Sequence, residues 1–417
     1  MRKIIAVLLC IAMTAIAFAG GANEKASDTP KLTMMFSSGG AGSSLTAAAE
    51  KFGELKGIEV EALTFPISEV YEKQILALAS NQATPDIIAI DDTWFPVLKG
   101  YLEPLDIDPA INEAFVPSYR DAFVDEGVQY AVPVRMGGEV ILYRTDVFEE
   151  NNIDPDSIKT WEDVLAVAQQ LYDPESDTYS WCGGYNEPAY LVMNWLNILS
   201  GYGVDAFNAD KTGFAFNSEQ GIKATKTFVE LTKCASPGIL SYGYNEEIEA
   251  FQNGSAVMGE LWTARYAAVN KEGLPYTGKF AVLPITPIGD GAGTEYGVDR
   301  VNGWGLGINR NCKNKELAEE FLEFVGSFEE QKRLAVEYSN SPVVEAVFSD
   351  PDYLEAVPVA DDMASAIAHG ITRPMHVRWQ EMEAAIAAEL QRAIIGQVTV
   401  EEALAAAEET CMGILED

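Results

Sequence analysis

The sequence predicts an α/β protein built as two lobes. Its first elements follow a β-loop-α-β order: a strand that runs into a glycine-serine loop over residues 31–44, a helix from Leu45 to Phe52, and a second strand over residues 57–65. This order is typical of a parallel sheet. The chain has 417 residues, which is too many for one hydrophobic core. A buried strand near the middle of the chain is also interrupted by polar and glycine residues.

This interrupted strand lies between Tyr130 and Phe148. An extended segment ends at Pro133, the break RMGGE follows at residues 135–139, and an apolar strand resumes over Val140–Tyr143. Paired glycines allow the backbone to bend, and the charges indicate a polar partner. Two interpretations remain open: a hinge that faces a cleft, or an ordinary bulge beside a buried ion pair.

The N-terminus has the layout of a secretory signal peptide over residues 1–19. Basic residues precede an apolar run, and small residues stand before Gly20. The run is too short to favour a membrane span. Cys10 lies inside the run and lacks a small residue before it, so we expect cleavage after Ala19 and a soluble periplasmic or extracytoplasmic protein rather than a lipoprotein.

Four cysteines follow the signal sequence: Cys182, Cys234, Cys312 and Cys411. An oxidising compartment permits disulfides, and four cysteines allow three pairings. We expect Cys182 to pair with Cys234, because both fall in the same central region. The absence of a CxxC spacing argues against a zinc site, and we expect no cofactor.

The charge balance excludes one class of partner. The chain has 28 Lys and Arg against 64 Asp and Glu, a formal net charge of −36. Proteins that bind nucleic acid obtain much of their affinity from a basic surface, which this composition cannot supply. Strong acidity indicates a solvated, self-repelling surface. We also expect the protein to be a monomer. Against this background, the few arginines near predicted strand ends become candidates for specific roles.

The first candidate site residues follow predicted strands of the first lobe. Ser38 lies in the loop after the first strand, and the strand Ile87–Ile90 ends on Asp91, Asp92 and Trp94. In parallel sheets the loops at strand ends form the ligand crevice. Carboxylates accept hydrogen bonds from paired hydroxyls, while an indole ring covers the apolar face of a polyol. The alternative is a helix N-cap formed by one aspartate beside a buried tryptophan.

Further candidates lie in the second half of the chain. Thr160 and Asp163 resemble a capping box at the start of a helix. Trp181 and Tyr185 flank a glycine loop and point either to a cleft or to the core. The remaining candidates are arginines, tryptophans and one glycine at predicted strand and helix ends: Trp262, Arg265, Arg300, Gly303, Trp304, Arg373 and Trp379.

Taken together and in order, these segments resemble the extracellular solute-binding proteins of bacterial ABC importers, in the family that includes maltose- and trehalose/maltose-binding proteins. The similarity covers almost all of the mature chain. The stretches that carry it are TPDIIAIDDTW, YAVPVRMGGEVILYRTDVF, TWEDVLAVAQQL, FQNGSAVMGELW, VLPITP, NGWGLGIN, KELAEEFLEFV and GQVTVEEAL.

The resemblance implies the two-lobed type II periplasmic-binding-protein fold, with discontinuous lobes joined by a hinge. It places crossings near residues 134–141, near residues 283–288 and near Asn340. The expected N-terminal lobe comprises residues 20–136 and 286–338. The expected C-terminal lobe comprises residues 137–285 and 339–417.

The resemblance also implies roles for matching residues. Asp91 or Asp92 matches the carboxylate that binds sugar hydroxyls, and Trp262, Trp304 and Trp379 match aromatic residues of the sugar pocket. The loop over residues 37–40 departs from the pattern, because it lacks the charged residues found there in maltose binding.

The first hinge departs as well, since it offers Arg135 and Gly137 where disaccharide binders often supply an acid. With Arg265, Arg300 and Arg373 also near the cleft, an anionic sugar or a sugar phosphate becomes a candidate ligand. The alternative is that these arginines pair with acids such as Asp91, Asp92, Glu139 or Asp299.

The function that follows from the resemblance is capture of a small, sugar-like ligand and its delivery to the transmembrane permease subunits. Closure of the lobes over the ligand would be a population shift. Two other classes of function stay open. A secreted carbohydrate-active enzyme would need a second matched acid, which the sequence does not supply. A ligand sensor for a membrane receptor would use the same fold.

Overall fold

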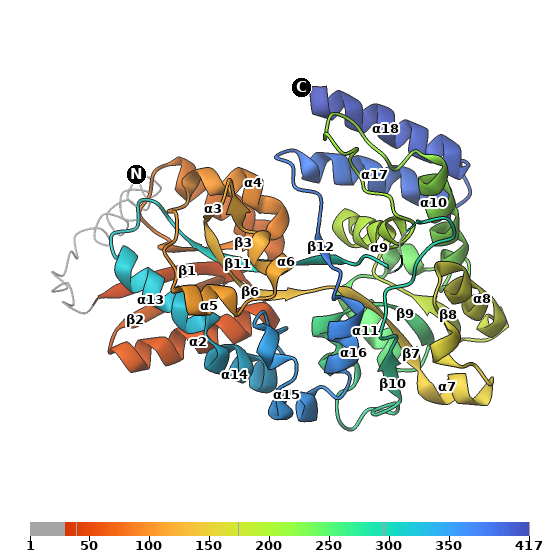
Figure 1. Ribbon diagram of the computed structural model, residues 1–417, viewed down its shortest axis with the longest axis horizontal. Coiled ribbons are helices and arrows are strands. Elements are labelled where there is room, and N and C mark those ends of the chain that lie inside the picture. The colour runs from red at the N-terminus through yellow and green to blue at the C-terminus, as the bar shows by residue number, and fades with distance from the viewer. Residues whose placement is uncertain (1–29, 39, 174, 294, 296, 417) are drawn as a thin grey trace, which may run out of the picture.

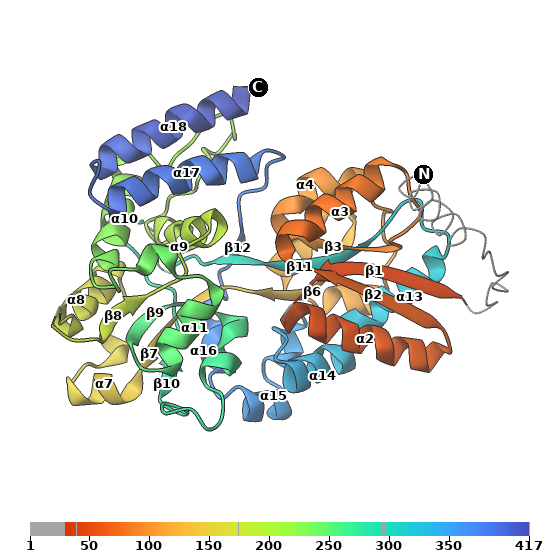
Figure 2. The ribbon, with the colours of Figure 1, turned by 180° about the vertical axis from the view of Figure 1, so that it is seen from behind.

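The computed structural model describes residues 30–416 except 39, 174, 294 and 296, so the predicted signal peptide lies outside the described residues. The chain forms two α/β lobes that lie side by side, each with its own sheet (Figures 1 and 2). The ribbon between β6 and β7 and the strand β11 run through the middle of the molecule and join the lobes (Figure 1). The predicted two-lobed α/β fold is therefore confirmed.

The N-terminal lobe is built on a six-stranded sheet in the order β12-β11-β3-β1-β2, with β6 paired to β11. Strand β1 pairs in parallel with both β2 and β3, as the β-loop-α-β order predicts, whereas β11 runs antiparallel to β3 and β6. The strands are β1 (Lys31–Ser37), β2 (Glu59–Phe65), β3 (Ile87–Asp91), β6 (Ala131–Gly137), β11 (Arg300–Ile308) and β12 (Ile371–Thr372).

Helices cover both faces of this sheet (Figure 1). The structure differs from the prediction in the glycine-serine loop, because α2 already begins at Gly40 and includes the glycine and serine residues from there on. Of the described residues between β1 and α2, Ser38 alone remains outside both elements. The helices are α2 (Gly40–Lys56), α3 (Ile67–Ala79), α4 (Phe95–Leu98), α5 (Pro109–Glu113), α6 (Pro117–Asp121), α13 (Lys315–Gly326), α14 (Phe328–Tyr338) and α15 (Pro351–Ala356), and a small hairpin joins β4 (Val124–Asp125) to β5 (Val128–Gln129).

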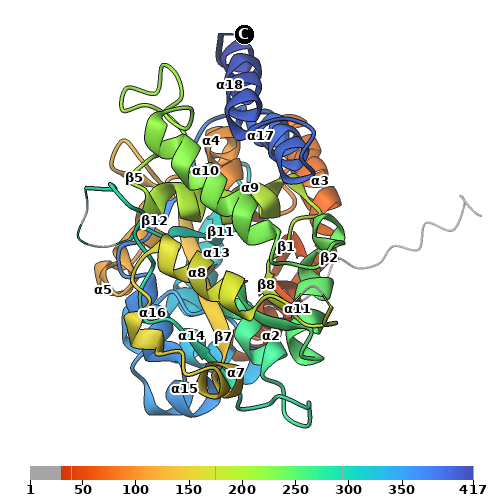
Figure 3. The same cartoon turned by 90° about the vertical axis from the view of Figure 1, so that its right-hand side faces the viewer.

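The C-terminal lobe has a four-stranded sheet in the order β10-β7-β9-β8. Figure 3 looks onto this lobe, with α17 and α18 at one end and α7 at the other. Thr160 and Asp163 form the predicted capping box at the start of α8. The strands are β7 (Glu139–Arg144), β8 (Tyr179–Cys182), β9 (Ala256–Trp262) and β10 (Phe280–Val282); the helices are α7 (Thr145–Glu150), α8 (Trp161–Leu171), α9 (Pro188–Gly201), α10 (Glu219–Thr232), α11 (Tyr244–Gln252), α12 (Tyr266–Val269), α16 (Ala360–Ala366), α17 (Trp379–Ile394) and α18 (Val400–Glu416).

The first crossing between the lobes lies at Gly138. Strand β6 ends at Gly137 in one sheet, and β7 begins at Glu139 in the other. A Cβ atom at Gly138 would collide with the Asp299 carboxylate, which stands at the start of another crossing. A glycine at this position therefore allows two crossing segments to touch, and the interrupted strand of the sequence is a connection between sheets.

The other two crossings lie later in the chain than the predicted positions. Residues 283–288 stay with the C-terminal lobe, because Leu283 donates to Ile141 and Ile288 bridges to Thr160. The chain returns to the first sheet only at Arg300, where β11 begins. The prediction missed this because the proline-rich exit of β10 is followed by a long irregular segment.

The third crossing also lies beyond Asn340. The Asn340 amide donates to the Val134 carbonyl at 2.9 Å, and Val343 accepts from the backbone of Val116, so both residues belong to the N-terminal lobe. Helix α15 still lies beside α14, whereas α16 packs on the other lobe through a 2.6 Å bond from the Thr286 hydroxyl to the Ala366 carbonyl. The crossing therefore falls between α15 and α16.

All four cysteines of the described chain are free and buried, so the expected pairing of Cys182 with Cys234 is wrong. Burial raises the pKa of the Cys182 thiol to about 12. The Cys312 thiol instead donates to Asp86 at 3.2 Å. Over the part of the chain described here, no helix is both long and apolar enough to span a bilayer.

Candidate functional site

The two aspartates at the end of β3 are held by an arginine from a distant part of the chain. The Arg373 guanidinium donates to Asp91 at 2.5 Å and contacts both oxygens of Asp92. Asp91 also caps the following turn by accepting from the Thr93 backbone and hydroxyl. The structure therefore shows the two arrangements that the sequence offered as alternatives to a ligand site. Asp91 acts as an N-cap, and Arg373 forms an ion pair with both aspartates.

Burial sets the electrostatics of this cluster. Loss of solvent raises the pKa of Asp92 to about 6, although Arg373 opposes the shift. Burial lowers the pKa of Arg373, but the two aspartates attract the proton more strongly and leave its pKa raised. On α17, burial raises the pKa of Glu383 to about 7, and its carboxylate accepts from the Trp379 indole at 3.1 Å. The cluster therefore links β3 of one lobe to α17 of the other.

An aromatic group stands beside these acids. Trp304 on β11 lies opposite Asp91 on β3 in the sheet register. Its ring contacts Trp94 edge to face with ring centroids 5.2 Å apart, and it contacts Phe36 at 5.1 Å. Tyr71 packs on Trp94 at 5.0 Å. Trp94 and Trp304 are each 7% exposed, so only a small part of each ring is accessible.

A second contact joins the lobes at the hinge. The Arg135 guanidinium of β6 lies over the Trp262 ring of β9, 5.2 Å from its centroid. Such a stack places a planar cation and an indole face together, which is a favourable arrangement. Gly303 has a φ of 149°, and a Cβ there would collide with the Arg135 carbonyl. The glycine therefore serves the close approach of β11 to β6.

The other arginines are paired with carboxylates. Arg265 forms a buried ion pair with Glu247 and lies 5.3 Å from the Tyr190 ring centroid. Arg300 pairs with Asp205 at 2.8 Å and also donates to a serine hydroxyl and a backbone carbonyl. With Arg373, three of the four arginines proposed to bind an anion are thus occupied by acids of the same chain.

A match to a family of known proteins agrees with this architecture. A family model described as bacterial extracellular solute-binding protein matches residues 37–332. The chain belongs to this family. The solute-binding protein is 27% identical over 319 residues to a probable ABC transporter-binding protein of Deinococcus radiodurans, a match that covers 74% of this chain and 73% of the relative. It is 25% identical to an arabinooligosaccharide-binding protein of Bacillus subtilis, over 66% of this chain and 64% of the relative.

Two solved structures with the same fold, each in complex with a ligand, illustrate the similarity. Maltose-bound MalE3 of T. maritima superimposes with a TM-score of 0.80 at 25% identity and covers 93% of this chain and 99% of its own. A solute-binding protein of Agrobacterium radiobacter in complex with ribitol gives a TM-score of 0.81 at 20% identity, over 92% of this chain and 98% of its own. The fold of the solute-binding protein is therefore that of a MalE-like two-lobed binding protein.

Three of the predicted aromatic residues lie in the interior of the solute-binding protein. Trp181 and Tyr185 are 1% and 0% exposed, and the indole of one donates to the hydroxyl of the other at 3.1 Å. Trp379 is 1% exposed and packs on Phe207. Of the two alternatives for Trp181, the structure has the core position. Sequence spacing could not separate the two, because an aromatic residue beside a glycine loop suits either.

Ser38 lies at a different, open part of the N-terminal lobe. Its side chain is exposed, and it lines a cavity of about 360 Å³ with Thr46, Glu50, Thr64 and Tyr338. Its backbone N–H donates to Phe65 at 2.7 Å, which fixes the end of β1 against β2. This places Ser38 at a strand end, as predicted.

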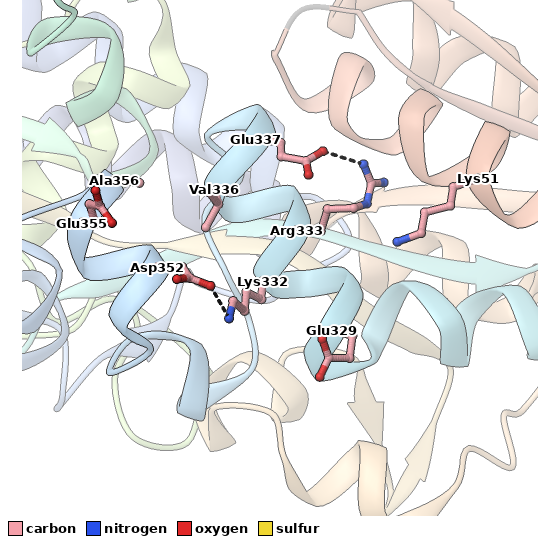
Figure 4. A pocket seen from close by; sticks show the side chains of 9 residues that line it. All are labelled: Lys51, Glu329, Lys332, Arg333, Val336, Glu337, Asp352, Glu355 and Ala356. Carbon is pink, nitrogen blue, oxygen red and sulfur yellow. Dashed lines mark hydrogen bonds and ion pairs between the residues drawn. The ribbon is translucent and has the colours of Figure 1, made fainter.

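A charged cavity of about 590 Å³ was not predicted. It lies between α14, α15 and α2 and is lined mainly by charged side chains (Figure 4). Lys332 points toward Asp352 at 2.6 Å and Arg333 toward Glu337 at 3.1 Å, so its charges are largely paired within the chain. No residue in this cavity belongs to the predicted ligand site.

Sequence reasoning named Asp91 and Asp92 as partners for an arginine but missed Glu247 and Asp205. These two acids lie on segments without a recognisable motif, and each meets its arginine only through the tertiary fold. The general excess of acids over bases was the one available indication, because it makes an unpaired buried arginine improbable. Among the described residues no group of three or more His, Cys, Asp or Glu is arranged to hold a metal ion.

Proposed function

We propose that this protein captures a neutral sugar or polyol between its lobes and delivers it to the permease subunits of an ABC importer. The observation that carries the proposal is the group formed by Asp91, Asp92, Trp94 and Trp304 at the inner end of the first sheet. Trp262 of the second sheet stands across the hinge from this group and contacts Arg135. Indole faces suit the apolar side of a sugar, and carboxylates suit its hydroxyls.

The pairing of the arginines supports a neutral rather than an anionic ligand. Binding a carboxylate or phosphate requires a guanidinium fork that can form new hydrogen bonds. Arg265, Arg300 and Arg373 are each buried against a carboxylate of this chain. An anion would have to displace one of these acids, and the displaced acid would remain buried without a cation. The names of relatives agree, since they bind arabinooligosaccharides and mannitol.

Closure of the lobes would complete the site. A ligand shifts the equilibrium toward the closed state only through contacts that this state offers and the open state lacks. Trp304 and Asp91 belong to one sheet and Trp262 to the other, so rotation about the hinge at Gly138 would bring further groups to a ligand already held by the first lobe. We propose binding without turnover, export with cleavage after Ala19, and a monomeric mature form.

A thermal-shift screen of the mature protein, stripped of carried-over ligand by unfolding and refolding, tests the proposed ligand class. A ligand that binds the folded state raises the melting temperature by mass action, so micromolar binding shows at millimolar ligand. We expect shifts with maltose or mannitol and none with glucuronate or glucose 6-phosphate. Shifts with the anions alone would refute the neutral class, and no shift with any of the four probes would refute the carbohydrate proposal.

Two variants connect the shift to the aromatic group. Trp304→Phe keeps a ring but reduces the face available to a sugar, so it should weaken binding while the fold persists. Trp195→Phe is the matched control, because this tryptophan packs on Phe216 and donates to Thr225 inside the C-terminal lobe. Equal loss of binding in both variants would contradict the placement of the site.

A further inference from the structure

The open cavity beside Ser38 has a lining that suits a carbohydrate. Its volume is about 360 Å³, and apart from a glycine and an alanine its residues carry five hydroxyls and one carboxylate: Ser38, Ser43, Thr46, Thr64, Tyr338 and Glu50. Tyr338 is 37% exposed, so part of its ring can meet a ligand. Hydroxyl and carboxylate groups form hydrogen bonds with the hydroxyls of a sugar, and an aromatic ring covers its C–H face.

The polar groups of this cavity take little part in holding the fold together. Within the described part of the chain, Glu50 forms no ion pair. The side-chain hydroxyls of Ser38, Thr46 and Thr64 form no hydrogen bond to the described residues. The charged cavity between α14, α15 and α2 differs, because its lysine and arginine are already paired with acids. A ligand can therefore replace water in the cavity beside Ser38 without breaking a contact of the protein.

The cavity lies at the same edge of the first sheet as the two aspartates. Strand β1 pairs in parallel with β3, with Met35 opposite Ile88. Continuing this register by three residues brings Ser38 level with Asp91, and neighbouring strands lie about 4.8 Å apart. Strand β2 follows on the other side of β1, and its Thr64 lines the cavity. The groups that can hold a sugar therefore continue from the end of β3 past β1 to β2.

The Tyr338 side chain is held in place before any ligand binds. Tyr338 is the last residue of α14, and Ser339, in the left-handed conformation with a φ of 54°, ends the helix directly after it. The Arg333 guanidinium lies 5.3 Å from the centroid of the Tyr338 ring and is itself paired with two glutamates. A ring that is already ordered loses less conformational freedom when a ligand packs against it.

We infer that this cavity is an outer subsite that holds a further sugar unit, so that the ligand of this solute-binding protein is a neutral oligosaccharide. The inner units lie at Asp91 and Trp304, and the ligand then passes Ser38. The outer unit packs on Tyr338 and donates a hydroxyl to Glu50. The Glu50 carboxylate repels an acidic sugar, which agrees with a neutral ligand. The inference rests on the proposed function and specifies the length of its ligand.

Isothermal titration calorimetry with maltose and maltotetraose tests the inference on the mature protein, stripped of carried-over ligand. Both probes are neutral and consist of glucose units, so their comparison isolates chain length. We expect the parent protein to bind maltotetraose roughly tenfold more tightly than maltose, because a further sugar unit is stacked and hydrogen-bonded. In Tyr338→Ala this ratio should fall to about twofold or less, with the affinity for maltose unchanged.

A second variant tests the same subsite at a position where the fold is not at stake. Glu50 is exposed on α2, so Glu50→Gln should fold like the parent protein. It removes the charge that accepts a hydroxyl of the outer unit, and it should lower the ratio roughly threefold. The affinity for maltose should again stay the same.

Tyr101→Ala is the matched control. Tyr101 is a partly buried tyrosine of the same lobe, with Arg310 5.8 Å from its ring centroid. Arg310 lies just past β11, whose Ile308 pairs with Ile87 at the opposite edge of the sheet. This variant should therefore keep the ratio of the parent protein.

The outcomes separate the inference from the proposed function. A parent ratio near one, a ratio that survives in both Tyr338→Ala and Glu50→Gln, or an equal loss of affinity for both sugars in Tyr338→Ala would overturn the inference alone. Binding of mannitol without binding of maltose or maltotetraose would do the same. Absence of binding by all three probes would refute the proposed function and the inference with it.

Discussion

Replacement of Arg373 is the most direct test of the charge cluster at the lobe boundary. Arg373→Gln keeps a polar side chain of similar reach but removes the cation that faces Asp91 and Asp92. The Asp92 side chain is fully buried and the Arg373 side chain is 9% exposed, so water cannot replace the lost partner. Removing one member of a buried ion pair costs about 3–5 kcal/mol, because the other charge stays buried and unpaired.

The cost should depend on pH in a defined direction. Burial already raises the pKa of Asp92 to about 6 while Arg373 opposes that shift, so loss of Arg373 raises the pKa further. An acid with a raised folded pKa is protonated, and no longer an unpaired charge, at lower pH. The deficit in Arg373→Gln should therefore be larger at about pH 8 than near pH 6, because Asp92 in the variant takes up its proton above that pH.

Urea unfolding at the two ends of this pH range measures the effect. Arg392→Gln is the control, since Arg392 pairs with Glu389 on the surface of α17 and its side chain is 45% exposed. Exposed pairs contribute about 1 kcal/mol or less, so this variant should unfold almost like the parent. An Arg373→Gln midpoint equal to that of Arg392→Gln at the higher pH would refute the assignment of Arg373 as the partner of both acids.

Three further variants probe the boundary between the lobes. Trp304→Ala removes a ring packed against Trp94 and should cost about 3–5 kcal/mol of unfolding free energy in urea titrations. In the parent protein, burial raises the pKa of Glu383 to about 7, so the free energy of unfolding should fall by on the order of 3 kcal/mol as pH rises from the ordinary carboxyl range to about 7. Glu383→Gln should not show this fall. Urea midpoints at several pH values measure the difference. Gly138→Ala places a Cβ against the Asp299 carboxylate and should destabilise by about 1–3 kcal/mol in thermal unfolding, whereas Gly100→Ala, which meets no atom, should not.

Several elements of the fold could be predicted because they depend on local patterns, whereas the local sequence left a hinge and a bulge as alternatives and the resemblance to the family favoured the hinge. The strand order at the N-terminus, the capping box at Thr160 and the glycine break before β7 each need only neighbouring residues. The strand that ends on Asp91 and Asp92 was also found this way. Prediction failed where a long irregular segment follows a strand, as between β10 and Arg300, because nothing local marks which lobe such a segment covers.

Which acid pairs with which arginine could not be predicted, for a physical reason. Asp91 and Asp92 were among the acids named as partners, but Arg373 and Asp92 are 281 residues apart in the sequence, and Arg265 and Glu247 meet only because α11 packs beside the end of β9. A sequence shows that an arginine is present but not whether an acid is folded against it. The same holds for Cys182 and Cys234, which share a region of the fold yet keep free thiols.

This distinction changes what the site can bind. Read from the sequence, four arginines near the cleft make an anionic ligand a candidate, with pairing to acids of the chain as the alternative. Read from the structure, the charges of Arg265, Arg300 and Arg373 are already balanced by acids, and what the inner end of the first sheet offers is aromatic surface beside paired carboxylates. A neutral polyol can share a carboxylate oxygen with an arginine without separating the pair, because a carboxylate accepts about four hydrogen bonds. An anion would instead compete with Asp91 and Asp92 for the same guanidinium, which is the basis of the neutral ligand that we propose.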